Sequence, residues 1–352
     1  MAGRIYGQHT VVAHARTPDP GRTLVGAAAA GAAAAVDPLP APAPPDRKQR
    51  RFRLIAVEPI PVGMRRVAAG QLADAADELT AATPPQLGPA VHAARKRIKR
   101  VRAALRLSRA AIDERVYVRE NTQLRTIAGR LSQARDTRVL IETLAGLEAR
   151  FAADLPPHAT VKLRARLHDE HERALEALAA EDVAGTTSSA LMQAGARTAE
   201  WTFQRDDFAA LEPSLRRIYR RGRKRLRAAR EEPSAESLHD WRKRVKDLWH
   251  VAQLLRPADP KRMKRLSRRA HELADLLGDH HGLSVLRDYV ELHPNHFDDV
   301  PARDALLGVI DRRREALAAR ALKLGRAVYK RRPKRFVAEI ERGWRKRVQV
   351  RS

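Results

Sequence analysis

The sequence predicts an all-α protein with an internal repeat and a strongly basic surface. Alanine and leucine are abundant, only 4% of residues are aromatic, and the alternation typical of strands is nearly absent. Lys and Arg number 69 against 42 Asp and Glu, a formal net charge of +27. That charge exceeds what solubility requires, so we expect the partner to be an anion.

The N-terminal residues 1–55 have the composition of a disordered tail. They are rich in Gly and Ala and then in Pro, and such a segment cannot offset its ordering entropy through burial. The Ala/Gly run from Val25 to Val36 is only weakly apolar and begins too far into the chain to favour a signal peptide. The sequence has no cysteine and no run of about 18 apolar residues, so we expect a cytoplasmic protein without a membrane span.

Residues 56–345 show helical periodicity interrupted by prolines. The breaks at Pro84-Pro85, Pro156-Pro157, Pro213, Pro233, Pro257 and Pro301 predict eight to ten helices.

A nine-residue motif organises these helices into two halves. Val91-His92-Ala93-Ala94-Arg95-Lys96-Arg97-Ile98-Lys99 returns 147 residues later as Leu238-His239-Asp240-Trp241-Arg242-Lys243-Arg244-Val245-Lys246. A second echo relates residues 131–140 to residues 277–286. We therefore predict two pseudo-symmetric four-helix-bundle lobes, formed by residues of about 56–205 and 206–345, with a basic groove or channel between them.

Each copy of the motif predicts a helix with one apolar and one basic stripe. At 100° per residue, Val91, Ala94, Ile98, Val101 and Leu105 form a core-facing stripe. A second stripe about 110° round the helix carries the cations. Its members are His92, Arg95, Lys99, Arg102 and Arg106, with Lys96 at the margin.

The second copy repeats this geometry. Its core stripe consists of Leu238, Trp241, Val245, Leu248 and Ala252, and its polar stripe of His239, Arg242 and Lys246 with Lys243 beside it. Most charge runs are solvated faces of surface helices, and that interpretation is kept for Arg97, Arg100 and Arg244, which point elsewhere. The duplicated spacing favours a polyanion site for the rest, with the two histidines either contacting the ligand or only packing between helices.

These residues resemble the CHAD family, the conserved histidine α-helical domain, whose members carry an H-x-x-R-K-type helix in each of two halves. The segment Leu215–Arg223, which includes Arg220 and Arg223, and the segment Lys323–Arg326 are similar to further family segments. The resemblance implies a basic channel that binds inorganic polyphosphate, commonly on polyphosphate granules, and Arg220 and Arg223 are expected at its rim. The chain departs from the family pattern at Trp249-His250, where many relatives carry an Arg-Tyr pair.

No catalytic or cofactor motif accompanies the basic stripes, so we expect a binding protein and not an enzyme. The carboxylates form no recognisable metal cluster, and there is no phosphate-cradling Gly loop. Asp279-His280-His281 resembles a phosphoesterase signature but stands alone at an expected helix end. His168 and His171 have a spacing compatible with metal binding that is also common by chance.

Three other functions stand beside polyphosphate binding as alternatives, namely binding of nucleic acid, scaffolding and binding of a membrane surface. RNA or DNA suits the same charge, although the chain has only 15 Phe, Tyr and Trp residues with which to stack bases. A scaffold that recruits proteins to anionic granules is a second possibility. An anionic membrane surface is disfavoured because no helix joins a basic face to an exposed apolar one. The sequence does not define the oligomeric state or the preferred chain length of a polyphosphate ligand.

Overall fold

The computed structural model describes residues 50–156 and 158–349, and within them the predicted all-α class is confirmed. These residues form eleven α-helices and four short 3-10 helices, without a β-strand. The α-helices are α1 (Ile60–Thr80), α2 (Leu87–Ser108), α3 (Glu114–Arg130), α4 (Gln133–Arg150), α5 (Val161–Ala180), α6 (Val183–Ala196), α7 (Glu212–Glu231), α8 (Ala235–Leu254), α9 (Pro260–Leu292), α10 (Val300–Val328) and α11 (Pro333–Gln349). None of them is long and apolar enough to span a membrane.

The helix count exceeds the eight to ten predicted because acidic N-caps begin new helices at places where the chain has no proline. Asp113 caps α3, since its carboxylate accepts a hydrogen bond from the Arg115 amide at 2.7 Å. Asp182 caps α6 by accepting one from the Gly185 amide at 3.2 Å. Proline breaks identify several of the other boundaries, as Pro84 before α2 and Pro233 before α8 illustrate, although none separates α3 from α4.

The helices of the second half follow those of the first in the same order. Shifted by 147 residues, α8 becomes residues 88–107, which fall within α2, and α7, α10 and α11 likewise overlap α1, α5 and α6. The one difference is α9, which runs unbroken for 33 residues where the first half has α3 and α4. Asp279-His280-His281 therefore lies in the middle of a helix and not at a helix end, as the sequence had suggested. The pseudo-symmetric arrangement of two lobes stays a prediction.

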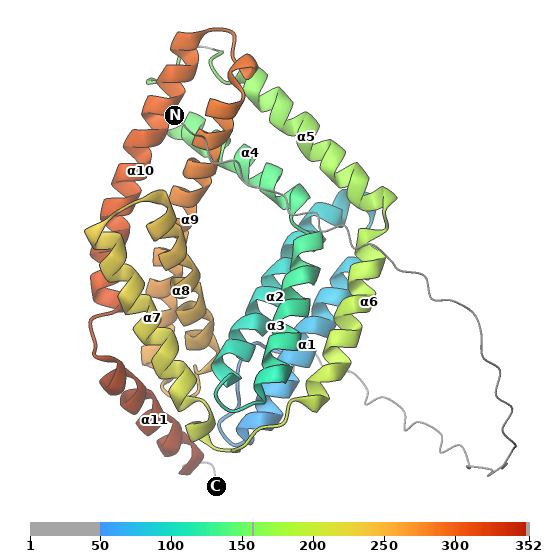
Figure 1. The fold of residues 1–352 in the computed structure, drawn as a ribbon, viewed down its shortest axis with the longest axis vertical. Coiled ribbons are helices and arrows are strands. Elements are labelled where there is room, and N and C mark those ends of the chain that lie inside the picture. The colour runs from blue at the N-terminus through green and yellow to red at the C-terminus, as the bar shows by residue number, and fades with distance from the viewer. Residues whose placement is uncertain (1–49, 157, 350–352) are drawn as a thin grey trace, which may run out of the picture. The chain divides into compact units, whose positions relative to one another are not determined.

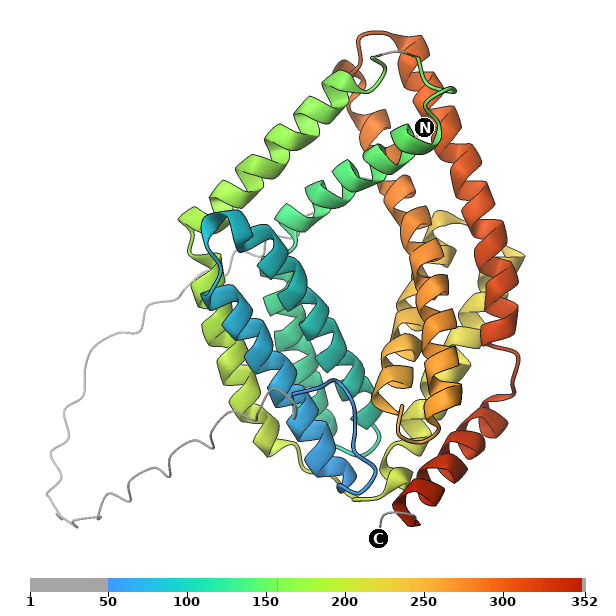
Figure 2. The same ribbon diagram turned by 180° about the vertical axis from the view of Figure 1, so that it is seen from behind.

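Two hydrophobic clusters hold these helices together. In both ribbon views α1, α2, α3 and α6 lie side by side, and α7, α8, α9 and α10 form another group (Figures 1 and 2). The first group shares a cluster that contains Leu72, Ile98 and Leu124. The other cluster is larger, extends from Leu54 to Trp344, and draws residues from both halves of the chain.

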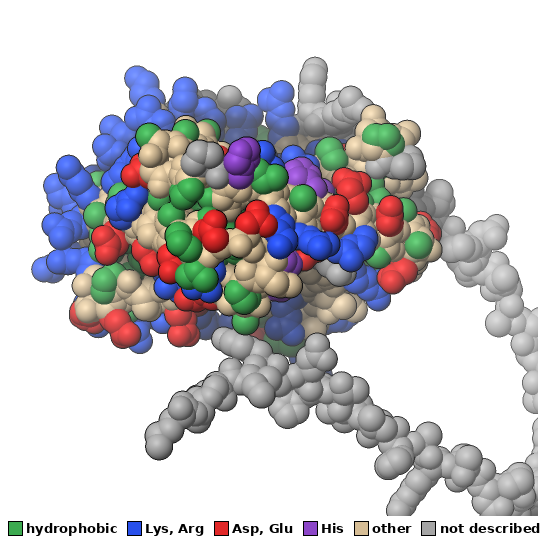
Figure 3. Space-filling view, turned by 90° about the horizontal axis from the view of Figure 1, so that it is seen from above, with side chains coloured by type: hydrophobic (Ala, Val, Ile, Leu, Met, Phe, Trp, Pro, Cys, Tyr) green, Lys and Arg blue, Asp and Glu red, His purple; other side chains and the backbone are tan. Residues whose placement is uncertain are grey.

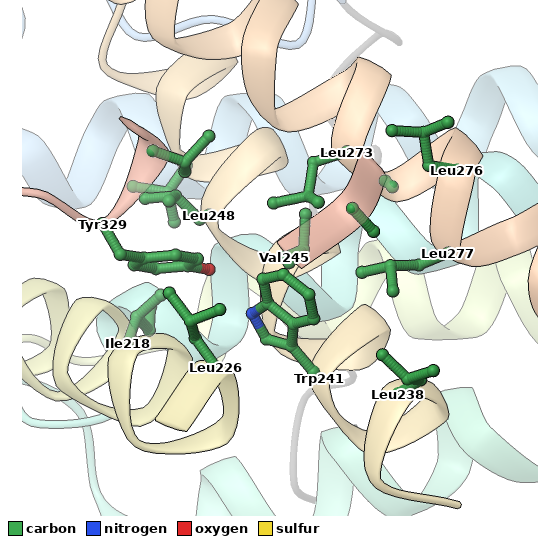
Figure 4. Packing of buried hydrophobic residues seen from close by; sticks show 14 of the residues in the cluster. Ile218, Leu226, Leu238, Trp241, Val245, Leu248, Leu273, Leu276, Leu277 and Tyr329 are labelled. Atoms are coloured by element: carbon green, nitrogen blue, oxygen red, sulfur yellow. The ribbon is translucent and has the colours of Figure 1, made fainter. Parts of the chain in front are cut away.

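Trp241 belongs to the larger cluster and explains a glycine in α10. Its indole is fully buried between Leu226, Val245 and Leu277 (Figure 4). A Cβ at Gly325 would lie only 2.5 Å from the indole ring, so α10 can approach α8 this closely only with glycine at that position. The tryptophan of the second basic helix thus fixes α8 against α10.

The predicted tail boundary lies several residues too late. Residues 1–49 lie outside the described residues, but residues 50–55 belong to the folded part. The Leu54 side chain is buried, and its amide donates to the Leu254 carbonyl at 3.1 Å. Arg50 forms ion pairs with Asp74 at 3.1 Å and Asp77 at 2.7 Å on α1. This segment consequently ties α1 to the end of α8.

Candidate anion-binding site

The predicted core stripes of the two basic helices are confirmed. Val91, Ala94, Ile98, Val101 and Leu105 of α2 are all buried. Their counterparts in α8 are buried as well, namely Leu238, Trp241, Val245, Leu248 and Ala252. Because these stripes fix the rotation of each helix about its axis, they also fix where the basic stripes point.

On α2 the cations become more enclosed toward the C-terminal end. His92 and Lys96 are exposed, whereas Arg95, Lys99, Arg102 and Arg106 are half-buried. Arg95 donates a hydrogen bond to the Ala128 carbonyl of α3. Arg102 donates to Asn121 at 3.2 Å, and burial, together with the charge of Arg106, lowers its guanidinium pKa. These arginines therefore help to hold α3 against α2 as well as supplying charge.

Asp247 joins the two basic helices and was not identified from the sequence. It is buried and accepts ion pairs from Arg106 of α2 at 2.8 Å and from Arg244 of α8 at 3.1 Å. Asp247 stands 147 residues after Arg100, so the repeat itself carries a carboxylate in place of a cation at this position. That departure from the motif was the available signal. Arg106, predicted as a ligand residue, is engaged in this link.

The cations that the helical wheel directs away from the basic stripes have partners of their own. Arg97 pairs with Asp74 at 2.7 Å and with Glu78 at 2.5 Å, both on α1. Arg100 donates to Gln71 at 3.1 Å and lies 5.5 Å from the centre of the Phe52 ring. Together with the Arg244 pair, these contacts serve packing between helices.

On α8 the predicted residues meet α9. The His239 ring lies 3.9 Å from the His281 ring, and burial, followed by Lys243 and Arg242, lowers the pKa of His239. Lys243 pairs with Asp240 at 3.0 Å. His239 is therefore largely neutral at pH 7 and packs between helices.

Arg242 lines a cavity of about 700 Å³ between α4, α9 and α10. Gly278 makes room for it, since a Cβ there would lie 3.2 Å from the guanidinium. The cavity balances three cations against three carboxylates, which are Arg150, Arg242, Arg313, Glu142, Asp275 and Asp279.

The stripe of α8 continues to Trp249, where a second cavity begins. Trp249 lies seven residues after Arg242 and hence within about 20° of it around the helix. Its ring contacts that of His271 on α9 at 4.2 Å, and His271 pairs with Asp275 at 2.7 Å. Beyond this contact lies a cavity of about 450 Å³.

This second cavity, which we call the α8–α9 groove, is strongly basic. Five cations and no carboxylate are among the described residues that line it: Arg256, Lys261, Lys264, Arg265 and Arg268. A neighbouring cavity of about 470 Å³ shares Gln253, Arg256 and Ser267 with it and adds Arg50, Arg51 and Arg53. Positive charge therefore extends from the α8–α9 groove to the segment that precedes α1.

The structure brings only some of the predicted residues to these cavities. Arg242 lines the first one, while Arg220 and Arg223 on α7 line neither. Arg220 is exposed, and Arg223 donates to the Arg331 carbonyl at 2.6 Å. Whether Arg95, Lys99 and Lys246 bind the same ligand stays a prediction. The basic run from Lys261 to Arg269, which supplies most of the α8–α9 groove, was visible in the sequence but lies outside the repeated motif.

The chain belongs to the CHAD family. The model of the CHAD domain matches residues 66–291, which include α2, α8 and nearly all of α9. Among solved structures, PptA from Streptomyces chartreusis is similar, with a TM-score of 0.51 and 17% identity over 75% of this chain and 98% of PptA. That likeness concerns the fold. No curated protein matches the chain.

Proposed function

We propose that this protein binds inorganic polyphosphate along α8 and in the α8–α9 groove, and that it does so without cleaving it. The observation that carries the proposal is the set of five cations in the groove with no carboxylate among them. Grouped cations repel one another, and a polyanion relieves that repulsion while releasing its own counterions. Membership of the CHAD family supports the same ligand.

The aromatic residues favour polyphosphate over nucleic acid. Sequence-tolerant binding of single strands uses aromatic rings on which bases stack. Three of the four tryptophans are buried, and Trp249, the one that reaches the groove, contacts the rings of His250 at 4.7 Å and His271 at 4.2 Å. The groove thus offers charge and hydrogen-bond donors, which suffice for a ligand without bases.

Binding without catalysis fits the distribution of carboxylates. Cleavage of phosphoanhydrides ordinarily uses carboxylates that hold a divalent metal ion. Here Glu142, Asp275 and Asp279 share their cavity with three arginines, and the more basic groove has none. We also propose, from the family membership, that the protein holds the polymer at cytoplasmic polyphosphate granules.

The proposal is tested by neutralising the groove. The variant Lys261→Gln/Lys264→Gln/Arg268→Gln should bind long-chain polyphosphate at least about 30-fold more weakly, because each lost charge-assisted contact contributes on the order of 1 kcal/mol or more. Binding is followed by the change in tryptophan fluorescence, which we assign to Trp249 because the other three tryptophans are buried away from the ligand.

Arg115→Gln/Arg130→Gln/Arg173→Gln is the matched control, because it removes the same charge from exposed positions on α3 and α5. It should change the affinity less than about threefold. Equal losses in the two triple variants would show that net charge and not the groove governs binding, and an unchanged groove variant would overturn the proposal.

A further inference from the structure

A further basic cavity, distinct from the α8–α9 groove, lies on the side of α9 that faces α10 and α11. Its volume is about 620 Å³, and α7, α9, α10 and α11 all contribute to it. Seven cations line it: Arg262, Arg265, Arg269, Lys330, Arg331, Arg332 and Arg335. Most of its lining outside α9 lies beyond residue 291, where the match to the CHAD domain model ends.

The turn between α10 and α11 is held rigidly beside this cavity. The Tyr219 hydroxyl donates to the Val328 carbonyl at 3.3 Å and accepts from the Arg331 amide at 3.2 Å. Arg223 donates to the Arg331 carbonyl at 2.6 Å. The carbonyl of Val328, at the end of α10, and that of Arg331, in the turn, are therefore both hydrogen-bonded, and these bonds fix the turn and its cations opposite α9.

One carboxylate neutralises only part of this charge. Glu339 pairs with Arg262, with Arg331 at 2.6 Å and with Arg335 at 3.1 Å, and although burial opposes it, these arginines lower the pKa of Glu339. Among the described residues, no carboxylate lies within ion-pair distance of the remaining four cations, all of them exposed: Arg265, Arg269, Lys330 and Arg332. The N-terminus of α11 begins at Pro333 beside them and adds its positive dipole end.

One flank of the molecule is also rich in cations. Viewed from above, Lys and Arg side chains crowd the left flank (Figure 3), which is the side of α7 and α10 in Figure 1. Such a concentration of positive charge favours a negatively charged polymer.

Arg265 lines both this cavity and the α8–α9 groove, so the two basic surfaces meet across α9. We propose that one polyphosphate chain wraps around α9 and occupies both. The cavity between α9 and the α10–α11 turn, which we call the arm, then extends the binding site of the α8–α9 groove. The inference rests on the proposed function and adds to it a preference for chains long enough to reach the arm.

Inorganic polyphosphate fits the arm better than a nucleic acid does. Its two aromatic rings, Tyr219 and Phe336, stack on each other at 3.9 Å and are 1% and 3% exposed. No ring is left there for a base. Once one segment of a chain is bound, the other segment is at high effective concentration, which strengthens binding of long chains without any new kind of contact.

The experiment compares tripolyphosphate with long-chain polyphosphate in the full chain and in an arm variant, Arg269→Gln/Lys330→Gln/Arg332→Gln. The unsubstituted protein should prefer the long chain, and the arm variant should reduce the ratio of the two affinities at least about tenfold. Binding of the long chain by the arm variant should also depend less on salt. The slope of log K against log salt should become shallower by about 2, because three cationic contacts are lost. Arg115→Gln/Arg130→Gln/Arg173→Gln should leave the ratio unchanged.

The outcomes separate the two proposals. If the arm variant keeps the affinity ratio of the control, the arm does not bind polyphosphate, although the proposal of binding in the α8–α9 groove stands. If the unsubstituted protein binds neither phosphate, the proposed function itself fails. If the arm variant weakens the binding of single-stranded RNA but not of polyphosphate, the surface serves nucleic acid and the inference is overturned.

Discussion

His250 shows how a single side chain depends on the charges around it. It is buried in α8, with its ring edge-on to Phe52 at 5.9 Å and stacked on Trp249 at 4.7 Å. Burial, followed by the charges of Arg100 and Lys246, lowers the pKa of His250 to about 3. The imidazole is therefore neutral in the folded protein across the physiological range, and it does not add to the repulsion between the nearby cations Arg100 and Lys246.

This histidine predicts a loss of stability in acid. The unfolded chain binds a proton at His250 below about pH 6.5, whereas the folded chain does so only near pH 3, so stability is complete above pH 6.5 and falls as the pH decreases between these values. At pH 4.5 the expected loss in the free energy of unfolding, relative to its value above pH 6.5, is on the order of 2 to 3 kcal/mol. His250→Gln should remove that part of the loss when free energies of unfolding in urea are compared at pH 7.5 and 4.5.

Burial also lowers the pKa of His280, to about 4. The variant should therefore still lose some stability as the pH decreases. Parallel decreases for the variant and the unsubstituted protein would mean that His250 titrates normally and that the burial argument is wrong.

At the scale of elements, α2 and α8 are joined through a carboxylate that the motif does not contain. Asp247 holds Arg106 and Arg244, and the nearby Arg102 and Arg221 both interact with its charge. Without it, several guanidinium groups from α2, α7 and α8 would repel one another in a partly enclosed space. The basic helices can approach each other because of this one negative charge.

Asp247→Asn should therefore lower the free energy of unfolding by about 2 to 3 kcal/mol, because it leaves half-buried arginines without their counter-charge. Asp240→Asn is the comparison on the same helix. It breaks the pairs with Arg225 and Lys243, whose side chains are each 49% exposed, and should cost less than about 1 kcal/mol. Chemical denaturation of both variants measures the difference, and equal, small losses would show that Asp247 is not a structural link.

At the scale of the molecule, the sequence predicts the helices and their core faces better than it predicts the site. The stripes of α2 and α8 follow directly from helical periodicity, as the burial of Ile98 and Val245 confirms. The α8–α9 groove depends on how α9 packs against the end of α8, and no local pattern encodes that contact. The burial of Leu54 was missed for a similar reason, because its partners in α8 lie about 200 residues away along the chain.

The net charge of +27 allows the whole molecule to attract any polyanion, so discrimination has to come from the shape of its surface. The α8–α9 groove and the arm on α9 share Arg265, and the only rings in their described lining that are not buried are the half-buried Trp249 and the exposed His271, which contact each other at 4.2 Å. An inorganic chain has its charges close together and can bend around a helix without unstacking any bases. A nucleic acid loses base stacking when it bends and finds few rings to replace it.

We therefore expect long-chain polyphosphate to displace a fluorescent single-stranded RNA from the protein at least about tenfold more effectively than unlabelled RNA or DNA at equal phosphate concentration. Both affinities should fall as salt rises, because both ligands release counterions, yet the order of the competitors should persist. The neutralised groove variant should lose most of this preference, whereas Arg115→Gln/Arg130→Gln/Arg173→Gln should keep it. Equal displacement by all three polymers would mean that the protein responds to charge alone, since a shaped site must distinguish polymers that differ in stiffness and charge spacing.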